Sequence, residues 1–370
     1  MKKYGLGEIK LWVQTLGVSI SPTFIQVLKS NYNVPHLNYD KIFFYILDNK
    51  NQKYPVYTFI NNSSKSFKLI RIDQSFKLSK NLYLIDIEFD KKIDIYDDEI
   101  EKTKLNKIAC IEANNHLAVT LSHFCIHFFD KEECKFCSIN NWSDNNQTSI
   151  RQKIIAIKKY IESNNVKHLS ITTGTINRTD KGVKSIIKFC SELRDRGVLL
   201  PIAVEFEPIN NTDYFNDLQK LGITTVSINI EFLQPNIRKL LMPGKGKIDI
   251  ELYKKNWQYA VKTFSAGQVF TNVLLNRFEH NLNIMYDSLE KITSIGVIPS
   301  IGLLLPENGT QLSGLKLPDF NYQLKIHSFN TKCLFKYKLN PLLAKAGCPR
   351  NGSYSPTNEF YLDNLLKERV

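Results

Sequence analysis

Cys125, Cys134 and Cys137 are the residues of this sequence whose type and spacing are best suited to chemistry. They form a C-x8-C-x2-C pattern directly after an apolar run. Thiolates are soft ligands, and three of them around a four-iron cluster leave one iron open to another molecule. A structural zinc site normally has four protein ligands, so zinc would need one more, for example His123 or His127. Buried cysteines that bind no metal are the third interpretation of this spacing.

The elements that must position these cysteines show a regular alternation from about residue 117. Short apolar segments predict strands at 118–122, 169–173, 202–206, 225–230, 269–275 and 297–304. Amphipathic segments between them predict helices at 150–163, 182–196, 212–221, 234–241, 249–264 and 283–295. Such alternation indicates an α/β fold with a parallel sheet, and at this length a full or partial (β/α) barrel.

Polar residues follow several of these predicted strands, at the end of a barrel where active sites lie. The cysteine cluster falls in the loop after the first strand. Thr172-Thr-Gly-Thr175 follows the second and allows close approach to an anion, or is an ordinary turn. Glu205 and Glu207, and likewise Asn229 and Glu231, have the i, i+2 spacing that puts two side chains on one face of a strand. Both pairs are candidates to bind a substrate or cofactor, or to cap the strands with polar contacts.

The remaining chain divides into a region before this alternation and one after it. Short β-branched and aromatic segments at 41–47, 57–60, 67–72 and 82–89 predict a small β-rich N-terminal region. We therefore expect a β-rich region over 1–105, a barrel core over 106–315 and a C-terminal extension over 316–370.

Cysteines outside the cluster have less informative surroundings. Cys333 and Cys348 in the C-terminal extension could hold an auxiliary cluster, but they form no close pair and are more simply unpaired thiols. Cys110 and Cys190 are expected in apolar surroundings.

The composition indicates in which compartment the protein works and which kinds of partner it binds. The net charge of +13 comes from 49 basic and 36 acidic residues, but the lysines are dispersed without a dense basic stretch, which argues against a nucleic-acid partner. No run of 18 apolar residues and no signal peptide is present, which predicts a cytoplasmic protein that does not contact a membrane. Seven cysteines, an odd number, indicate reduced thiols in a reducing compartment rather than a disulfide framework.

Taken in order, these motifs resemble the radical S-adenosylmethionine superfamily, and within it the biotin-synthase-like branch. Cys134-Lys-Phe-Cys137 has the aromatic residue that typically precedes the last cysteine of that family. Gly174 and Thr175 stand where the family's glycine-rich motif binds the amino group of the cofactor. The usual spacing is C-x3-C-x2-C, so the eight-residue gap after Cys125 identifies a divergent member.

Further along the chain the resemblance rests on strand ends. Asn229 and Glu231 resemble the pair that holds the cofactor ribose, and Arg238 follows in the next helix, where a basic residue often accompanies it. Glu279 ends a segment that resembles the family's Val-Gly-x-Gly-Glu stretch. The segment 298–310 resembles the family's strand leading to a Gly-Thr turn.

The resemblance implies a [4Fe-4S] cluster held by the three cysteines, with S-adenosyl-L-methionine on the open iron. A one-electron reductant such as flavodoxin or ferredoxin would drive cleavage to a 5′-deoxyadenosyl radical, which abstracts hydrogen from a small metabolite or peptide. Cofactor-binding roles fall to Gly174, Thr175, Glu205, Asn229, Glu231, Arg238 and Glu279. The alternatives are a zinc-stabilised nucleic-acid or protein binding module without catalysis, and a degenerate barrel that serves as a non-catalytic partner.

Overall fold

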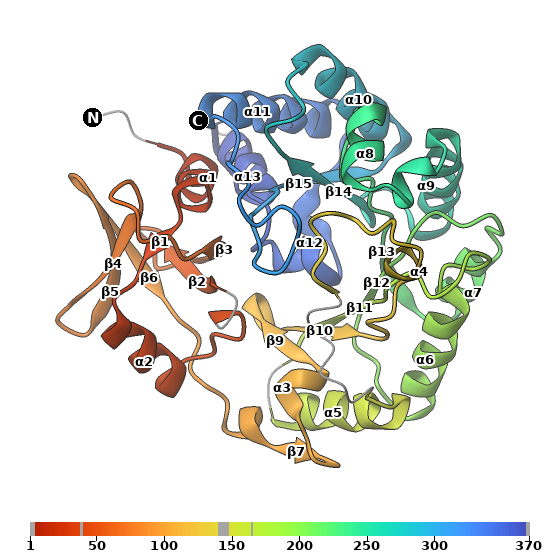
Figure 1. Cartoon of the computed structure of the whole chain (residues 1–370), viewed down its shortest axis with the longest axis horizontal. Coiled ribbons are helices and arrows are strands. Elements are labelled where there is room, and N and C mark those ends of the chain that lie inside the picture. The colour runs from red at the N-terminus through yellow and green to blue at the C-terminus, as the bar shows by residue number, and fades with distance from the viewer. Residues whose placement is uncertain (1–3, 38–39, 140–147, 164–165, 368–370) are drawn as a thin grey trace.

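A curled, seven-stranded sheet forms the centre of the molecule in the computed structural model, which describes residues 4–37, 40–139, 148–163 and 166–367 (Figure 1). The strand order is β15-β14-β13-β12-β11-β10-β9. Neighbours from β10 to β15 pair in parallel, and β9 is antiparallel to β10. The strands are β9 (Cys110–Glu112), β10 (His116–Thr120), β11 (His168–Thr172), β12 (Ile202–Glu205), β13 (Ile223–Ser227), β14 (Val269–Leu275) and β15 (Ile298–Leu303). In the described part of the chain β9 and β15 do not pair, so the sheet is a partial barrel.

Helices cover the outer, convex face of this sheet (Figure 1). They are α5 (Ile150–Ser163), α6 (Val183–Asp195), α7 (Tyr214–Lys220), α9 (Ile250–Phe264), α10 (Leu282–Ile295) and α11 (Phe320–Lys336). The helix α8 (Pro235–Leu241) instead packs its Ile237 and Leu241 in a separate cluster with the partly buried Cys134 and Phe136. Several helices begin at a side-chain cap: Asp249 accepts a hydrogen bond from a backbone N–H at the start of α9, and Asn281 does so for α10. The six predicted strands and six predicted helices are confirmed, with ends that differ by a few residues at most.

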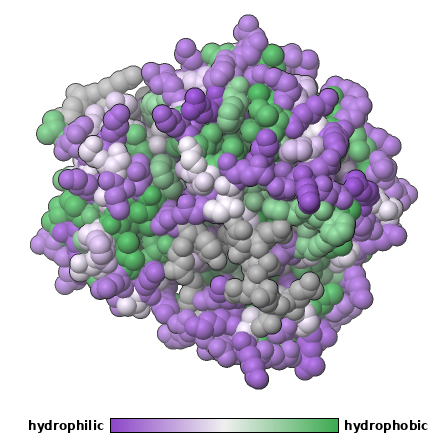
Figure 2. Space-filling model, in the orientation of Figure 1, coloured by the Kyte–Doolittle hydropathy of each residue, from purple (hydrophilic) through white to green (hydrophobic). Residues whose placement is uncertain are grey.

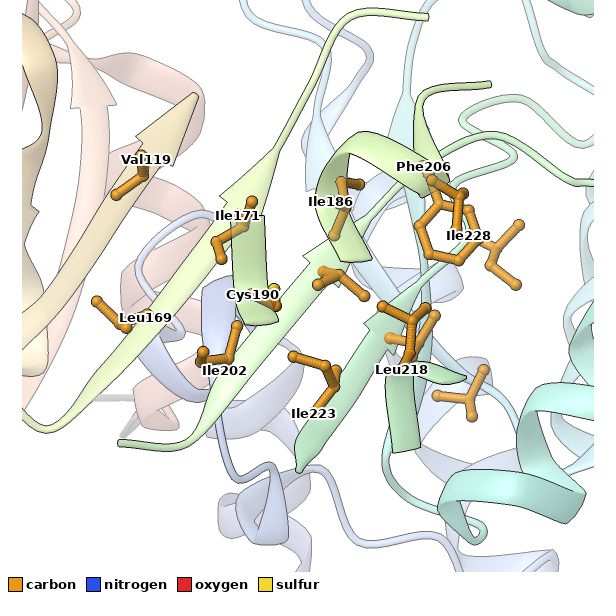
Figure 3. Close-up of a cluster of buried hydrophobic side chains, with 14 of the residues drawn as sticks. Val119, Leu169, Ile171, Ile186, Cys190, Ile202, Phe206, Leu218, Ile223 and Ile228 are labelled. Atoms are coloured by element: carbon orange, nitrogen blue, oxygen red, sulfur yellow. The ribbon is translucent and has the colours of Figure 1, made fainter. Parts of the chain in front are cut away.

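The hydrophobic core lies between the sheet and these helices (Figure 3). Residues at alternate positions of a strand point to the same face, and Leu169 and Ile171 of β11 pack outward toward Ile186 and Cys190 of α6. All four side chains are completely buried. The position expected for Cys190 in apolar surroundings is therefore confirmed.

The concave face of the sheet carries small and polar side chains, and the C-terminal helix α12 (Gly347–Asn351) packs against it. A Cβ added to Gly347 would lie 2.4 Å from the Cβ of Ala203, so only glycine allows this approach. The backbone N–H of Gly347 donates to Nδ1 of His168 at 3.1 Å. His168 also stacks on His116, with ring centroids 4.8 Å apart. The inside of the partial barrel is thus filled by the chain's own C-terminal segment.

A second sheet lies in the N-terminal part, with strand order β1-β4-β5-β6-β2-β3. Its strands are β1 (Val18–Ser19), β2 (Lys41–Leu47), β3 (Lys53–Phe59), β4 (Phe67–Ile72), β5 (Ser75–Lys80) and β6 (Tyr83–Glu88). The β character predicted for this region is therefore present. Two helices that the sequence pattern did not predict, α1 (Leu6–Leu16) and α2 (Pro22–Asn31), accompany the sheet (Figure 1).

The remaining elements are the C-terminal helix α13 and several short strands, helices and turns. These are β7 (Glu99–Ile100), β8 (Thr103–Lys104), α3 (Leu105–Ile108), α4 (Ile126–Phe129), α13 (Thr357–Lys367) and 3₁₀ turns at Asp94–Asp97, Ala113–Asn115, Lys245–Lys247 and Pro341–Leu343.

The N-terminal helix α1 packs against α13 near the other end of the chain. Nζ of Lys10 is completely buried and lies 2.9 Å from Oε1 of Glu359 and 2.6 Å from the carbonyl oxygen of Gly352. The carboxylate of Asp363 accepts hydrogen bonds from the backbone N–H groups of Leu6 and Gly7, which begin α1. The first and last described segments therefore hold each other in place.

The surface in Figure 2 is mostly hydrophilic, with hydrophobic residues in smaller groups. Among the described residues, no helix combines the length and apolar character needed to cross a lipid bilayer.

Candidate functional site

The loop that carries Cys125 runs alongside the residues that follow β11. The backbone N–H of Gly174 donates to the carbonyl oxygen of Ser122 at 2.9 Å, and the N–H of Ile126 donates to the carbonyl oxygen of Thr175 at 2.8 Å. These bonds continue the pairing of β10 with β11 beyond the strand ends. Cys125 is therefore fixed at the carboxyl edge of the sheet.

Gly174 is required by this close approach. A Cβ at residue 174 would lie 2.2 Å from the carbonyl oxygen of Phe124 and 3.0 Å from the Cβ of Cys125. The atoms that approach this glycine closely are those of the cysteine loop, and binding of an anion or cofactor here stays a prediction.

The eight residues between Cys125 and Cys134 form the short helix α4 and a return loop. His127 of α4 is buried, and its Nε2 lies 2.7 Å from Oε1 of Glu207, which follows β12. The loop packs against the segment after α8: the N–H of Gly244 donates to the carbonyl oxygen of Glu132, and a Cβ at Gly244 would lie 2.3 Å from Nδ1 of His127. The long gap thus anchors the cysteine loop both at the end of β12 and on the segment after α8.

Cys134 and Cys137 lie in one tight turn, in which the N–H of Cys137 donates to the carbonyl oxygen of Cys134 at 2.9 Å. Burial raises the pKa of Cys134 above its usual value. Burial, and to a lesser extent the nearby Cys125, raises the pKa of Cys137 to about 11. Both are therefore protonated at neutral pH, and each would lose its proton on binding a metal.

A buried ion pair lies next to Cys134. Nζ of Lys245 is 2.6 Å from Oε1 of Glu231, and both side chains are nearly buried. Burial alone would lower the pKa of Lys245, but the charge of Glu231, with Tyr253 and Glu207, raises it above its usual value. Lys245 is therefore a cation at neutral pH, positioned to stabilise negative charge on Cys134.

Glu231 adopts a left-handed backbone conformation, with φ of 58°, that is uncommon for a residue with a side chain. Its backbone still joins the sheet, because its N–H donates to the carbonyl oxygen of Asn272 and its carbonyl oxygen accepts from the N–H of Leu274. In the described part of the chain, Oε2 of Glu231 is buried and has no hydrogen-bond partner. The strained residue therefore holds an unsatisfied acceptor at the strand end.

Lys245 was missed from the sequence because nothing in strand periodicity points to it. A signal does exist in its two flanking glycines, since a Cβ at Gly246 would lie 2.5 Å from the carbonyl oxygen of Arg238. Because neither Gly244 nor Gly246 has room for a Cβ, the backbone on both sides of Lys245 is tightly packed and fixes the position of the lysine.

Asn229 and Glu205 form a second polar group on neighbouring strand ends. Nδ2 of Asn229 donates to Oε2 of Glu205 at 3.2 Å, and its Oδ1 accepts from the N–H of Asn272 at 3.0 Å. Burial raises the pKa of Glu205, and the nearby Cys348 and Asn229 oppose that rise. Asn229 thus links the ends of β12, β13 and β14.

Arg238, which lies in α8, and Glu279 contact the backbone just after and just before this helix rather than the cysteines. A terminal nitrogen of Arg238 donates to the carbonyl oxygen of Ile248 at 2.5 Å. Oε1 of Glu279 accepts from the backbone N–H groups of Leu233 and Gln234, at 2.8 and 2.7 Å, just before α8 begins. As arranged here, both side chains fix the α8 segment, on which Lys245 depends.

A cavity of about 330 Å³ opens beside this site. Its wall includes Phe136 between two of the cysteines, Asn272 of β14 and Cys348 of α12. The N-terminal region closes it with side chains such as Lys41 and Tyr57. The cavity therefore extends from the cysteine loop to the N-terminal sheet, and its volume is in the range of small-molecule sites.

Comparison with known proteins gives only distant likenesses. No family model matches the sequence, and no curated protein is significantly similar to it. The structure is similar to HydG, a maturase of the [FeFe]-hydrogenase, with 14% identity, 61% of this chain and 51% of HydG covered, and a TM-score of 0.43. It is also similar to the spore cortex-lytic enzyme SleL of Bacillus megaterium QM B1551, with 11% identity, 67% of this chain and 59% of SleL covered, and a TM-score of 0.31.

This chain spans about half the length of HydG and about three fifths of SleL. Neither superposition is close enough to assign a function.

One expectation about the other cysteines is wrong. Cys110 lies in polar surroundings, with its Sγ 3.9 Å from Nε2 of His36 and with Glu112 two residues away on the same strand. The partner His36 is 74 residues distant in sequence, so local apolarity could not reveal it. Cys333 and Cys348 join no group of three potential metal ligands among the described residues.

Proposed function

We propose that this protein is a radical S-adenosylmethionine enzyme whose [4Fe-4S] cluster is held by Cys125, Cys134 and Cys137. The observation that carries the proposal is the position of all three cysteines in one loop at the carboxyl edge of a parallel sheet. There Cys134 and Cys137 adjoin the buried groups Lys245 and Glu231. Barrel-type enzymes place their chemistry at this edge.

The spacing of the thiols argues against a single zinc ion held by all three. A tetrahedral zinc site with Zn–S bonds of about 2.3 Å brings its sulfur atoms to about 3.8 Å from one another. Among the described residues, the three thiols do not form a group whose donor atoms all lie within 4.8 Å. A four-iron cluster bridges more widely separated thiolates, since each cysteine binds a different iron.

Buried polar groups support a bound S-adenosyl-L-methionine. The unpartnered Oε2 of Glu231 would accept a hydrogen bond from a ribose hydroxyl, and Asn229 and Glu205 lie on the adjoining strands. Residues Gly174 and Thr175 border Cys125, where the amino group of the cofactor is expected. When bound and reduced, the cofactor would supply a radical able to remove hydrogen from an unactivated carbon.

The chain's own residues would orient the bound cofactor and enclose the substrate. Lys245 would offset the negative charge of the thiolates, and the ion pair keeps it in place. The cavity beside Phe136 is the candidate substrate site, and its walls of β14, α12 and the N-terminal region would exclude water from it. A small metabolite or a peptide side chain would fit, with flavodoxin or ferredoxin as electron donor.

Anaerobic reconstitution with iron and sulfide tests the proposal. We expect about four irons per chain, a charge-transfer absorbance and reductive cleavage of S-adenosyl-L-methionine. Cys125→Ala, Cys134→Ala and Cys137→Ala should each abolish that cleavage, whereas Cys333→Ser, at a buried cysteine of α11, should retain it. Binding of zinc without any cluster would instead support the alternative, a zinc-stabilised binding module. Full cleavage activity in any of the three alanine variants would refute the ligand assignment.

A further inference from the structure

We infer that His36, Cys110 and Glu112 form a second metal site, separate from the three-cysteine loop, and that it binds zinc. The three potential donor atoms all lie within 4.8 Å of one another, and among the described residues this is the set of three that does so. Nε2 of His36 is 3.9 Å from Sγ of Cys110 and 3.5 Å from Oε1 of Glu112.

These distances suit a tetrahedral ion. Bonds of about 2.0–2.3 Å from zinc to nitrogen, oxygen and sulfur place neighbouring donors roughly 3.3–3.8 Å apart. The two donor pairs that include His36 therefore need shifts of only a few tenths of an ångström to bind, and the third pair, Cys110 and Glu112, lies within 4.8 Å. A nitrogen, a sulfur and an oxygen donor together favour zinc over magnesium or calcium, which prefer oxygen alone.

Two elements of different regions bring the donors together. Cys110 and Glu112 are the first and last residues of the edge strand β9, and their i, i+2 spacing puts both side chains on one face. His36 comes from the loop before β2 of the N-terminal sheet, where its ring packs against Phe43 and Tyr57. A bound ion would therefore join the N-terminal region to the partial barrel.

The carboxylate of Glu112 is oriented by further contacts, as is usual for metal ligands. Its Oε2 lies 3.0 Å from Nδ1 of His116 and accepts from Nδ2 of Asn351 at 3.0 Å. The hydroxyl of Tyr354 donates to Oε1 at 2.6 Å. These contacts hold Glu112 toward His36 and Cys110.

Three protein ligands leave one tetrahedral position for water or a bound molecule. Tyr57 and Tyr354 contact the site through His36 and Glu112, and both line the 330 Å³ cavity. The zinc site would thus adjoin the cavity through Tyr57 and Tyr354, whatever reaction the cysteine loop supports.

Metal titration of the full chain tests this inference. The Cys125→Ala/Cys134→Ala/Cys137→Ala protein removes the competing thiols, and we expect it to retain about one zinc per chain after desalting. Cobalt should replace that zinc and give a thiolate-to-cobalt absorption band. Adding Cys110→Ser should abolish the band, and adding Glu112→Gln or His36→Gln should weaken zinc binding at least about tenfold.

Cys333→Ser in the same background is the matched control and should change neither result, with circular dichroism reporting the fold of each variant. Absence of retained zinc in the folded parent, or a cobalt band that survives Cys110→Ser, would overturn the inference. If Cys110→Ser fails to fold, unchanged zinc affinity in Glu112→Gln and His36→Gln would do so equally.

Discussion

Substitution of Gly174 by alanine tests how the sheet positions the cysteine loop. The added Cβ would lie 2.2 Å from the carbonyl oxygen of Phe124 and 2.9 Å from its carbonyl carbon. Both are backbone atoms, so no side-chain rotation relieves the contact. Residues 122–126 must move by about 1 Å to reach ordinary van der Waals separation.

That movement displaces Cys125, whose backbone is adjacent to the contact. Overpacking of this kind costs about 1–3 kcal/mol of stability, and a 1 Å displacement near a reacting centre costs about 100-fold in rate. We expect Gly174→Ala to lower the free energy of unfolding by that amount. Reductive cleavage of S-adenosyl-L-methionine should fall about 100-fold after anaerobic reconstitution.

Gly314→Ala is the matched control, because a Cβ at Gly314 meets no atom within 4 Å. It should leave iron content, stability and cleavage unchanged. Wild-type iron content and cleavage in Gly174→Ala would refute the reasoning, and so would equal losses in the two variants.

Three further predictions concern buried ionisable groups. Lys245→Met leaves Glu231 without its partner and should lower the free energy of unfolding in urea by about 3–5 kcal/mol, with partial recovery when Glu231→Gln is added. Lys10→Met should cost a similar amount, about 3–5 kcal/mol, with recovery by Glu359→Gln; additive losses in either pair would contradict charge pairing. Burial lowers the pKa of His327 to about 3. The unfolded chain, with a histidine pKa of about 6.5, therefore binds more protons between about pH 6.5 and 3. The free energy of unfolding consequently decreases as the pH is lowered through this range, by up to about 1.4 kcal/mol per pH unit. His327→Phe should flatten that slope, and an unchanged slope in pH-dependent urea titrations would disprove it.

The sequence predicted the partial barrel well because its strands and helices carry their own apolar patterns. Residues 150–163 form α5 as predicted, and 269–275 form β14. The helix α1 was missed because Lys10 and Gln14 lie on its buried face, where C-terminal residues pair with them. A helix whose buried face is polar shows no clear periodicity.

For the candidate site, the sequence located the cysteine loop and strand ends because each lies directly after an apolar strand. It could not predict the partners that arrive from elsewhere in the chain. Lys245 reaches Glu231 from the segment after α8, and His36 reaches Cys110 from the N-terminal region. The roles of the seven cofactor-binding residues and the three cysteine ligands stay predictions.

The position of α12 inside the partial barrel has a consequence for biosynthesis. Gly347 bonds to His168 of β11 across 179 residues, Asn351 bonds to Glu112 of β9 across 239, and Lys10 meets Glu359 across 349. Contacts so distant in sequence form late and slowly. Until residues 347–359 have been synthesised, the concave face of the sheet and the polar face of α1 stay hydrated, so neither the N-terminal region nor the partial barrel can complete its tertiary structure before that point.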